Sequence, residues 1–123
     1  MTDRGAVNGR LEAVIALRVR GPAGVEVEVS AVVDTGYTGS LTLPAAVTSS
    51  LGLEQRSGGR AVLADGSVRR FDTYAAEVLW GGSWVGVVAS ALGDETLLGM
   101  ALVAGRGLWV EAVPGGLVEL RPL

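Results

Sequence analysis

Residues 25–39 read VEVEVSAVVDTGYTG, and the interpretation of the whole chain starts from them. At alternate positions Val25, Val27, Val29 and Val33 share one face and Glu26, Glu28 and Ser30 the other, which predicts a half-buried strand. The strand runs directly into Asp34, Thr35 and Gly36 and a glycine-rich turn, so one carboxylate is expected at the end of a rigid element. Taken alone, the tripeptide favours a plain turn, because Asp and Gly are common turn residues and short motifs often match by chance. The rest of the sequence has to decide between these two readings.

Length and composition predict one globular domain. The chain has 123 residues, of which 49% are apolar and 19% charged, enough for a modest core but not for two lobes. Residues 1–9 are polar and contain glycine, so we expect a loose N-terminal arm before a folded domain over 10–123. No apolar run is long enough to span a membrane, and residues 1–10 lack the apolar core of a signal peptide. We therefore expect a cytoplasmic location for the protein. The net charge of −3 favours no nucleic-acid partner.

The residues that the sequence lacks narrow its possible chemistry. It contains no His, no Cys and no Lys, and all ten basic residues are Arg. This excludes Ser-His and Cys-His nucleophilic sites, Schiff-base lysines, and zinc sites built on imidazole or thiolate. We therefore expect no metal and no organic cofactor, and any acid–base catalysis must use carboxylates. The available aspartates are Asp3, Asp34, Asp65, Asp72 and Asp94.

Short strands and frequent turns predict an all-β barrel or sandwich. Strands are expected over 11–19, 25–33, 40–43, 60–63, 68–80, 84–89, 108–113 and 117–120. Short helical turns are expected over 44–51 and 100–104, the first beginning at a proline and capped by Gly52. Asp65-Gly66 predicts a hairpin with a type I′ turn, and Gly81-Gly82 predicts a second hairpin.

Three segments occur in an informative order: VVDTGYTGSLTLP over 32–44, VLADGSVRRFDTY over 62–74 and ETLLGMALV over 95–103. Together they resemble the retropepsin-like aspartic proteases, and especially the small single-domain bacterial members of that clan. The resemblance covers about residues 11–120. It implies a closed acid-protease barrel of six or more strands with one or two short helical turns.

The resemblance also implies roles for individual residues. Asp34, Thr35 and Gly36 would form the catalytic loop, with Thr35 bonded to its counterpart in a second subunit. The hairpin tip would be a flap that closes over bound peptide, and the strand before Gly99 would support the catalytic loop. The flap and cleft residues are then Ala64, Asp65, Gly66, Ser67 and Tyr37, and the supporting residues are Leu97, Leu98 and Gly99.

The mechanism of this family needs two carboxylates about 3 Å apart that share one proton. The chain has a single Asp-Thr-Gly and no Asp-Ser-Gly, so the second Asp34 must come from another copy. We therefore expect a two-fold symmetric homodimer that hydrolyses a peptide or protein. The family suggests dimer contacts through the terminal strands, here 11–19 and 117–120. The alternative is a non-catalytic dimeric β-barrel that acts as a peptide-binding or assembly module.

Overall fold

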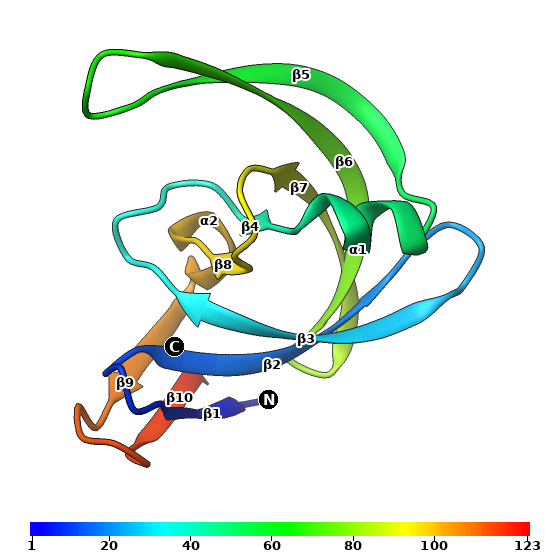
Figure 1. The fold of residues 1–123 in the computed structure, drawn as a ribbon. Helices are drawn as coiled ribbons and strands as arrows, with labels where there is room; N and C mark the ends of the chain where they lie inside the picture. Colours follow the sequence, from blue (N-terminus) through cyan, green and yellow to red (C-terminus); the bar gives the residue numbers. More distant parts are fainter.

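The computed structural model describes residues 1–123, apart from the side chain of Ala61. It contains a ten-stranded sheet and two short helices (Figure 1). The strands are β1 (Asp3–Val7), β2 (Ala13–Arg20), β3 (Glu26–Val33), β4 (Leu41–Thr42), β5 (Glu54–Val62), β6 (Val68–Trp80), β7 (Ser83–Ala91), β8 (Leu97–Leu98), β9 (Arg106–Val110) and β10 (Leu117–Pro122), and the helices are α1 (Ala45–Ser50) and α2 (Met100–Val103).

Six of the strands close into a ring. Their order is β6-β7-β4-β8-β3-β2, and the ring closes because β6 also pairs with β2 through Val19 opposite Val78 and Arg20 opposite Glu77. Strand β5 extends the sheet beyond β6, while β1, β10 and β9 extend it beyond β2. The expectation of an all-β closed barrel with short helical turns is confirmed.

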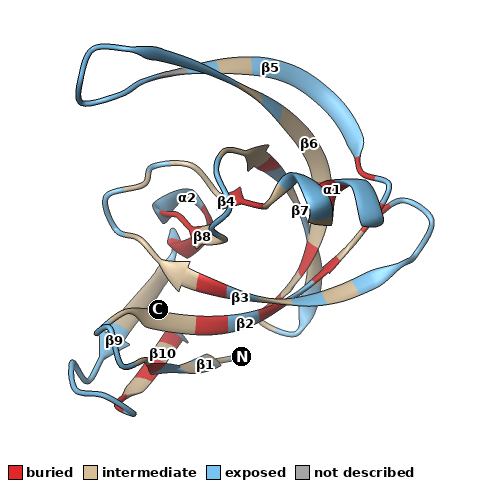
Figure 2. Cartoon of the chain, viewed as in Figure 1, coloured by how far each residue is buried: buried red, intermediate tan, exposed pale blue. Residues whose placement is uncertain are grey.

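The apolar alternation read from the sequence determines which side of each strand faces the core. In β2, Ile15, Leu17 and Val19 are buried, whereas Ala16 and Arg18 between them are exposed. In Figure 2 the buried positions lie along the strands of the ring and also on β10 and α2. Burying one such aliphatic side chain contributes about 2 kcal/mol, so the inward-facing residues fix the strand register.

The expectation of a loose arm over residues 1–9 is wrong for Asp3–Val7. These residues form β1, which pairs on both sides, with β2 and with β10. Oδ2 of Asp3 accepts hydrogen bonds from Nη1 of Arg106 at 2.5 Å and from the backbone N–H of Gly81 at 2.9 Å. The segment DRGAV carries little apolar periodicity, and its order comes from partners far away in the sequence.

The turn at the tip of the β5–β6 hairpin also differs from expectation. A three-residue loop, 64–66, connects the strands: the N–H of Gly66 donates to the carbonyl of Leu63 and the N–H of Leu63 donates to the carbonyl of Ser67. Only Gly66 in this loop has a positive φ, +84°. This is a type I turn followed by a left-handed glycine, not a type I′ turn. At the other hairpin both Gly81 and Gly82 have positive φ, as a two-residue type I′ connection requires.

We predict that Asp3→Ala lowers the free energy of unfolding by about 2 kcal/mol, because it leaves the guanidinium of Arg106, whose side chain is only 12% exposed, without its carboxylate partner. Urea unfolding measures the change. Arg4→Ala is the matched control, since Arg4 lies next in β1 and is exposed. Equal stability of the two variants would contradict the assigned role of β1.

Candidate active-site loop

Asp34 is held by the parallel pairing of β3 with β8. Val32 lies opposite Leu97 and Val33 opposite Leu98. The backbone N–H of Asp34 then donates to the carbonyl of Leu98 at 2.9 Å, which continues the ladder for one more residue. Because β8 is a member of the closed ring, the backbone of Asp34 is fixed to the barrel itself.

The loop after β3 folds around the carboxylate. Oδ1 of Asp34 accepts a hydrogen bond from the backbone N–H of Gly36 at 2.9 Å, and the Asp34 carbonyl accepts one from the N–H of Tyr37 at 3.1 Å. Asp34 is half-buried, whereas Thr35 and Gly36 are exposed. The geometry therefore presents a fixed carboxylate and an exposed Thr-Gly pair at the surface of the chain.

The start of α2 supports the other end of the loop. The N–H groups of Gly99, Met100 and Ala101 donate to the carbonyls of Ser40, Tyr37 and Gly39, at 2.9, 2.8 and 3.1 Å. A Cβ added to Gly99 would lie 2.0 Å from the Gly39 carbonyl oxygen and 2.6 Å from Cδ2 of Tyr37. Glycine is needed at position 99 because two backbones approach closely.

The ring of Tyr37 folds back over its own loop. A Cβ added to Gly39 would lie 2.3 Å from the Tyr37 hydroxyl oxygen, so the ring covers Gly39 as well as Gly99. The side chain that we expected in the cleft is half-buried and packs on the base of the Asp34 loop.

Sequence reasoning missed Thr42. Its hydroxyl donates to the carbonyl of Glu95 at 2.9 Å and accepts from the N–H of Leu97 at 2.8 Å, so it ties β4 to the segment leading into β8. Thr42 is only 2% exposed. A polar residue between two leucines, in LTL at 41–43, is the signal that could have indicated a buried hydrogen-bonding role.

The hairpin of β5 and β6 arches over the Asp34 loop in Figure 1, and its tip, Ala64–Ser67, is exposed. Oδ1 of Asp65 accepts hydrogen bonds from the hydroxyl of Ser67 at 2.6 Å and from the backbone N–H of Ser67 at 2.9 Å. These two bonds lower the pKa of Asp65, since they stabilise its ionised form. Among the described residues no hydrogen bond joins this tip to the Asp34 loop.

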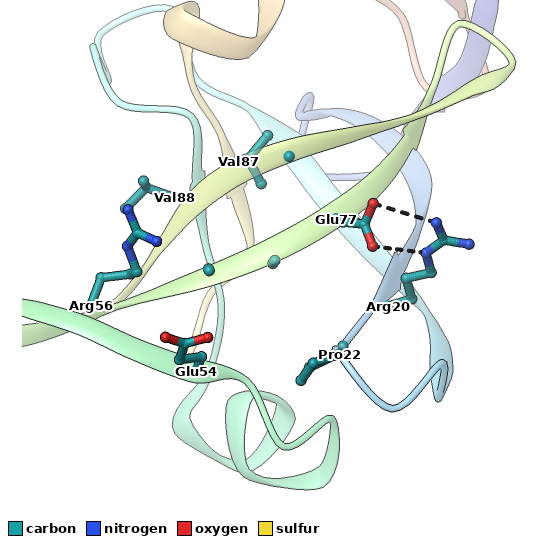
Figure 3. Close-up of a pocket in the computed structure, with 11 residues that line it drawn as sticks. Arg20, Pro22, Glu54, Arg56, Glu77, Val87 and Val88 are labelled. Carbon is teal, nitrogen blue, oxygen red and sulfur yellow. Dashed lines mark hydrogen bonds and ion pairs between the residues drawn. The ribbon is translucent and has the colours of Figure 1, made fainter.

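Two hollows lie elsewhere on the chain. One, of about 420 Å³, lies beside β6 and β7, where Glu77 pairs with Arg20 and the side chains of Glu54 and Arg56 reach toward it (Figure 3). The other, of about 520 Å³, lies on the β5–β6 hairpin. Neither is lined by Asp34. The described residues contain no group of three or more His, Cys, Asp or Glu that could hold a metal ion, and none of their helices is long and apolar enough to cross a membrane.

The closed ring, with the Asp34 loop at the β3–β8 pairing, is a closed all-β barrel fold. A solved structure with a similar fold is a retropepsin-like aspartic protease from Rickettsia conorii, with a TM-score of 0.58 over 98% of this chain and 93% of that chain. The two sequences are 18% identical, so the likeness shows a retropepsin-like fold. No protein-family model matches the chain, and no curated protein matches its sequence.

We predict that Gly99→Ala destabilises the protein by about 2 kcal/mol or more, because the added Cβ forces the Gly39 backbone away. Thermal unfolding measures the effect. Gly86→Ala is the control, since a Cβ there meets nothing within 4 Å and Gly86 lies inside β7; it should be neutral or slightly stabilising. If both variants were equally stable, close backbone packing at Gly99 would be refuted.

Ser67→Ala is expected to raise the pKa of Asp65 back toward its usual value of 3.8. In the wild type the folded-state pKa lies below that value, so the ionised carboxylate stabilises the tip above pH 3.8, and this stabilisation is lost as the pH falls through the folded-state pKa. Carboxyl chemical shifts followed through an acid titration test this. Ser83→Ala, at the other hairpin, should leave the titration of Asp65 unchanged, and an unchanged titration in Ser67→Ala itself would disprove the assignment.

Proposed function

We propose that this protein is an aspartic endopeptidase whose active site forms between two copies of the chain. One observation carries the proposal. Asp34 directly follows β3, its backbone N–H donates to the Leu98 carbonyl and its Oδ1 accepts from the Gly36 N–H, in a fold similar to that of a retropepsin-like aspartic protease. A carboxylate whose backbone is fixed by a ring of paired strands has the rigidity that acid–base catalysis needs.

A single chain supplies one such carboxylate, so the proposed catalytic pair consists of Asp34 from each copy around a two-fold axis. The exposure of Thr35 and Gly36 supports this arrangement, because these residues are free to meet their counterparts across the axis. Oδ1 of Asp34 is occupied by the Gly36 N–H, whereas Oδ2 accepts no hydrogen bond from the described part of the chain. Oδ2 is thus available to share a proton with the opposite carboxylate.

In the proposed reaction the ionised Asp34 takes a proton from a water molecule as the water oxygen attacks the peptide carbonyl carbon. The protonated Asp34 of the other copy gives its proton to the carbonyl oxygen, which produces a tetrahedral diol. The diol then collapses. The ionised Asp34 takes a proton from one hydroxyl, the protonated Asp34 gives its proton to the peptide nitrogen, and the C–N bond breaks to release an acid and an amine. The pair ends with one shared proton, as it began.

The β5–β6 hairpin would serve as the flap over the bound peptide, which would lie extended and be held by main-chain hydrogen bonds. The dimer contacts need revision. Strands β2 and β10, which contain most of the segments expected to make them, already pair on both sides. The free edge on that side of the sheet is β9, where Trp109 and Val110 are exposed. We propose that this edge and the Asp34 loop together meet the second copy.

Asp34→Asn is expected to abolish cleavage of a diverse unstructured peptide mixture at every pH from about 4 to 7, because it removes both carboxylates of the proposed catalytic pair. Mass spectrometry of the products measures cleavage, and sedimentation measures the dimer, which should persist. Because the substitution removes repulsion between two close carboxylates, the variant should unfold at the same or a higher temperature near neutral pH.

Asp94→Asn is the matched control, because Asp94 is exposed and lies in the loop before β8; it should cleave as the wild type does. Full activity of Asp34→Asn would refute the proposal. Failure of a folded, dimeric wild type to cleave any peptide would favour the alternative of a peptide-binding or assembly module.

A further inference from the structure

One face of the β5–β6 hairpin continues the inner face of the barrel. Ala76 is buried and Tyr74 packs against the core, and successive side chains of a strand alternate between its faces. Strand β6 is uninterrupted from Val68 to Trp80. Asp72 and Arg70 therefore lie on the same face as Tyr74, which is the underside of the hairpin where it arches over the Asp34 loop in Figure 1.

Two arginines meet on this underside. Arg60 of β5 lies directly opposite Arg70 of β6, so their Cβ atoms are about 5 Å apart and both side chains leave the same face. Like charges directly opposite each other destabilise a strand pair. Neither guanidinium has an ion-pair partner among the described residues, and both are exposed. The hairpin thus tolerates a repulsive pair that a bound anion would relieve.

The surroundings leave room for such an anion. Gly58, opposite Asp72, contributes no side chain, and the hollow of about 520 Å³ is lined by Arg60 and Arg70 together with Gly58, Gly59, Phe71 and Asp72. The ring of Phe71 covers Gly59, where an added Cβ would lie 2.5 Å from Cζ of the ring. Phe71 lies next to Arg70 in β6, so its side chain leaves the opposite face of the strand from the side chain of Arg70.

The charge of this region is opposite to that of the whole protein. The chain carries a net charge of −3, yet four of its ten arginines lie between residues 56 and 70. Arginine presents a planar fork of N–H donors that matches a carboxylate, and two such forks side by side favour a carboxylate ligand strongly.

We propose that the underside of the hairpin selects peptides that carry an acidic side chain, with Arg60 and Arg70 as the residues that determine specificity. This rests on the proposed function, in which the peptide lies between the hairpin and Asp34. In a two-fold dimer each copy supplies one arginine pair, so acidic residues are recognised on both sides of the cleaved bond.

The test uses a mixture of unstructured peptides made in pairs that differ only by Glu or Gln at one position. Binding is measured with full-length Asp34→Asn protein, and cleavage is measured with the wild type. We expect the Glu members to bind about fivefold more tightly than the Gln members, and the preference to shrink as salt is added. The same preference is expected in the cleavage rates.

The double variant Arg60→Gln/Arg70→Gln should lose the preference and unfold at the same or a higher temperature, since it removes a like-charge pair. Arg69→Gln is the matched control: Arg69 precedes Arg70 but lies on the other face of β6, and the preference should persist. Arg60→Glu/Arg70→Glu should prefer Lys-containing peptides over their Gln counterparts.

The possible failures are distinguishable. Acid-selective binding without any cleavage supports this inference and overturns the protease proposal. If the Glu and Gln peptides are bound equally tightly and cleaved at equal rates, the protease proposal is supported and this inference is overturned. Binding of no peptide, or equal loss of preference in Arg69→Gln and in the double variant, also overturns the assignment of Arg60 and Arg70.

Discussion

The short parallel pairing of β3 with β8 is the constraint on which the rest of the structure depends. Two residues of β3 pair with two residues of β8. In the described strand order, no other pairing connects β3 to the side of the ring that contains β4 and β7. Without it the ring would open, and the backbone of Asp34 would lose its bond to the Leu98 carbonyl. The same β3–β8 pairing therefore closes the barrel and positions the candidate catalytic carboxylate.

So short a pairing needs reinforcement, and the surrounding residues supply it. The buried hydroxyl of Thr42 satisfies both the N–H of Leu97 and the carbonyl of Glu95, which would otherwise be polar groups near the core. On the other side, the first N–H groups of α2 bond to the carbonyls of the Asp34 loop. Helix α2 therefore holds the loop through its backbone, while its Leu102 and Val103 are buried in the core.

One end of the sheet contrasts with this centre. The β5–β6 hairpin leaves the ring, loses its buried residues toward the tip and carries exposed arginines. Such a segment has few buried contacts to hold it in one position and belongs to the less stable part of the fold. A carboxylate fixed by strand pairing, with a less buried and charged hairpin arching above it, suits the proposed binding and selection of a peptide.

Much of the architecture was readable in the sequence. Alternating valines and leucines predicted β2 and β3, the glycine pair at 81–82 predicted a hairpin, and the absence of His, Cys and Lys left carboxylates as the candidate catalytic groups. These features are local: a period of two or a turn dipeptide can be recognised within a few residues. The position of Asp34 at the end of a strand was predictable for the same reason.

Only the tertiary structure decided the features that depend on distant partners. Strand β1 is ordered by an ion pair between Asp3 and Arg106, which are 103 residues apart, and its own sequence has little strand character. Gly99 is required by the carbonyl of Gly39, and Arg60 meets Arg70 through the register of a hairpin whose turn type differs from the one predicted. Local periodicity determined which residues could form strands, whereas long-range packing and hydrogen bonding decided which of them lie side by side, because these contacts join groups that no short sequence window contains.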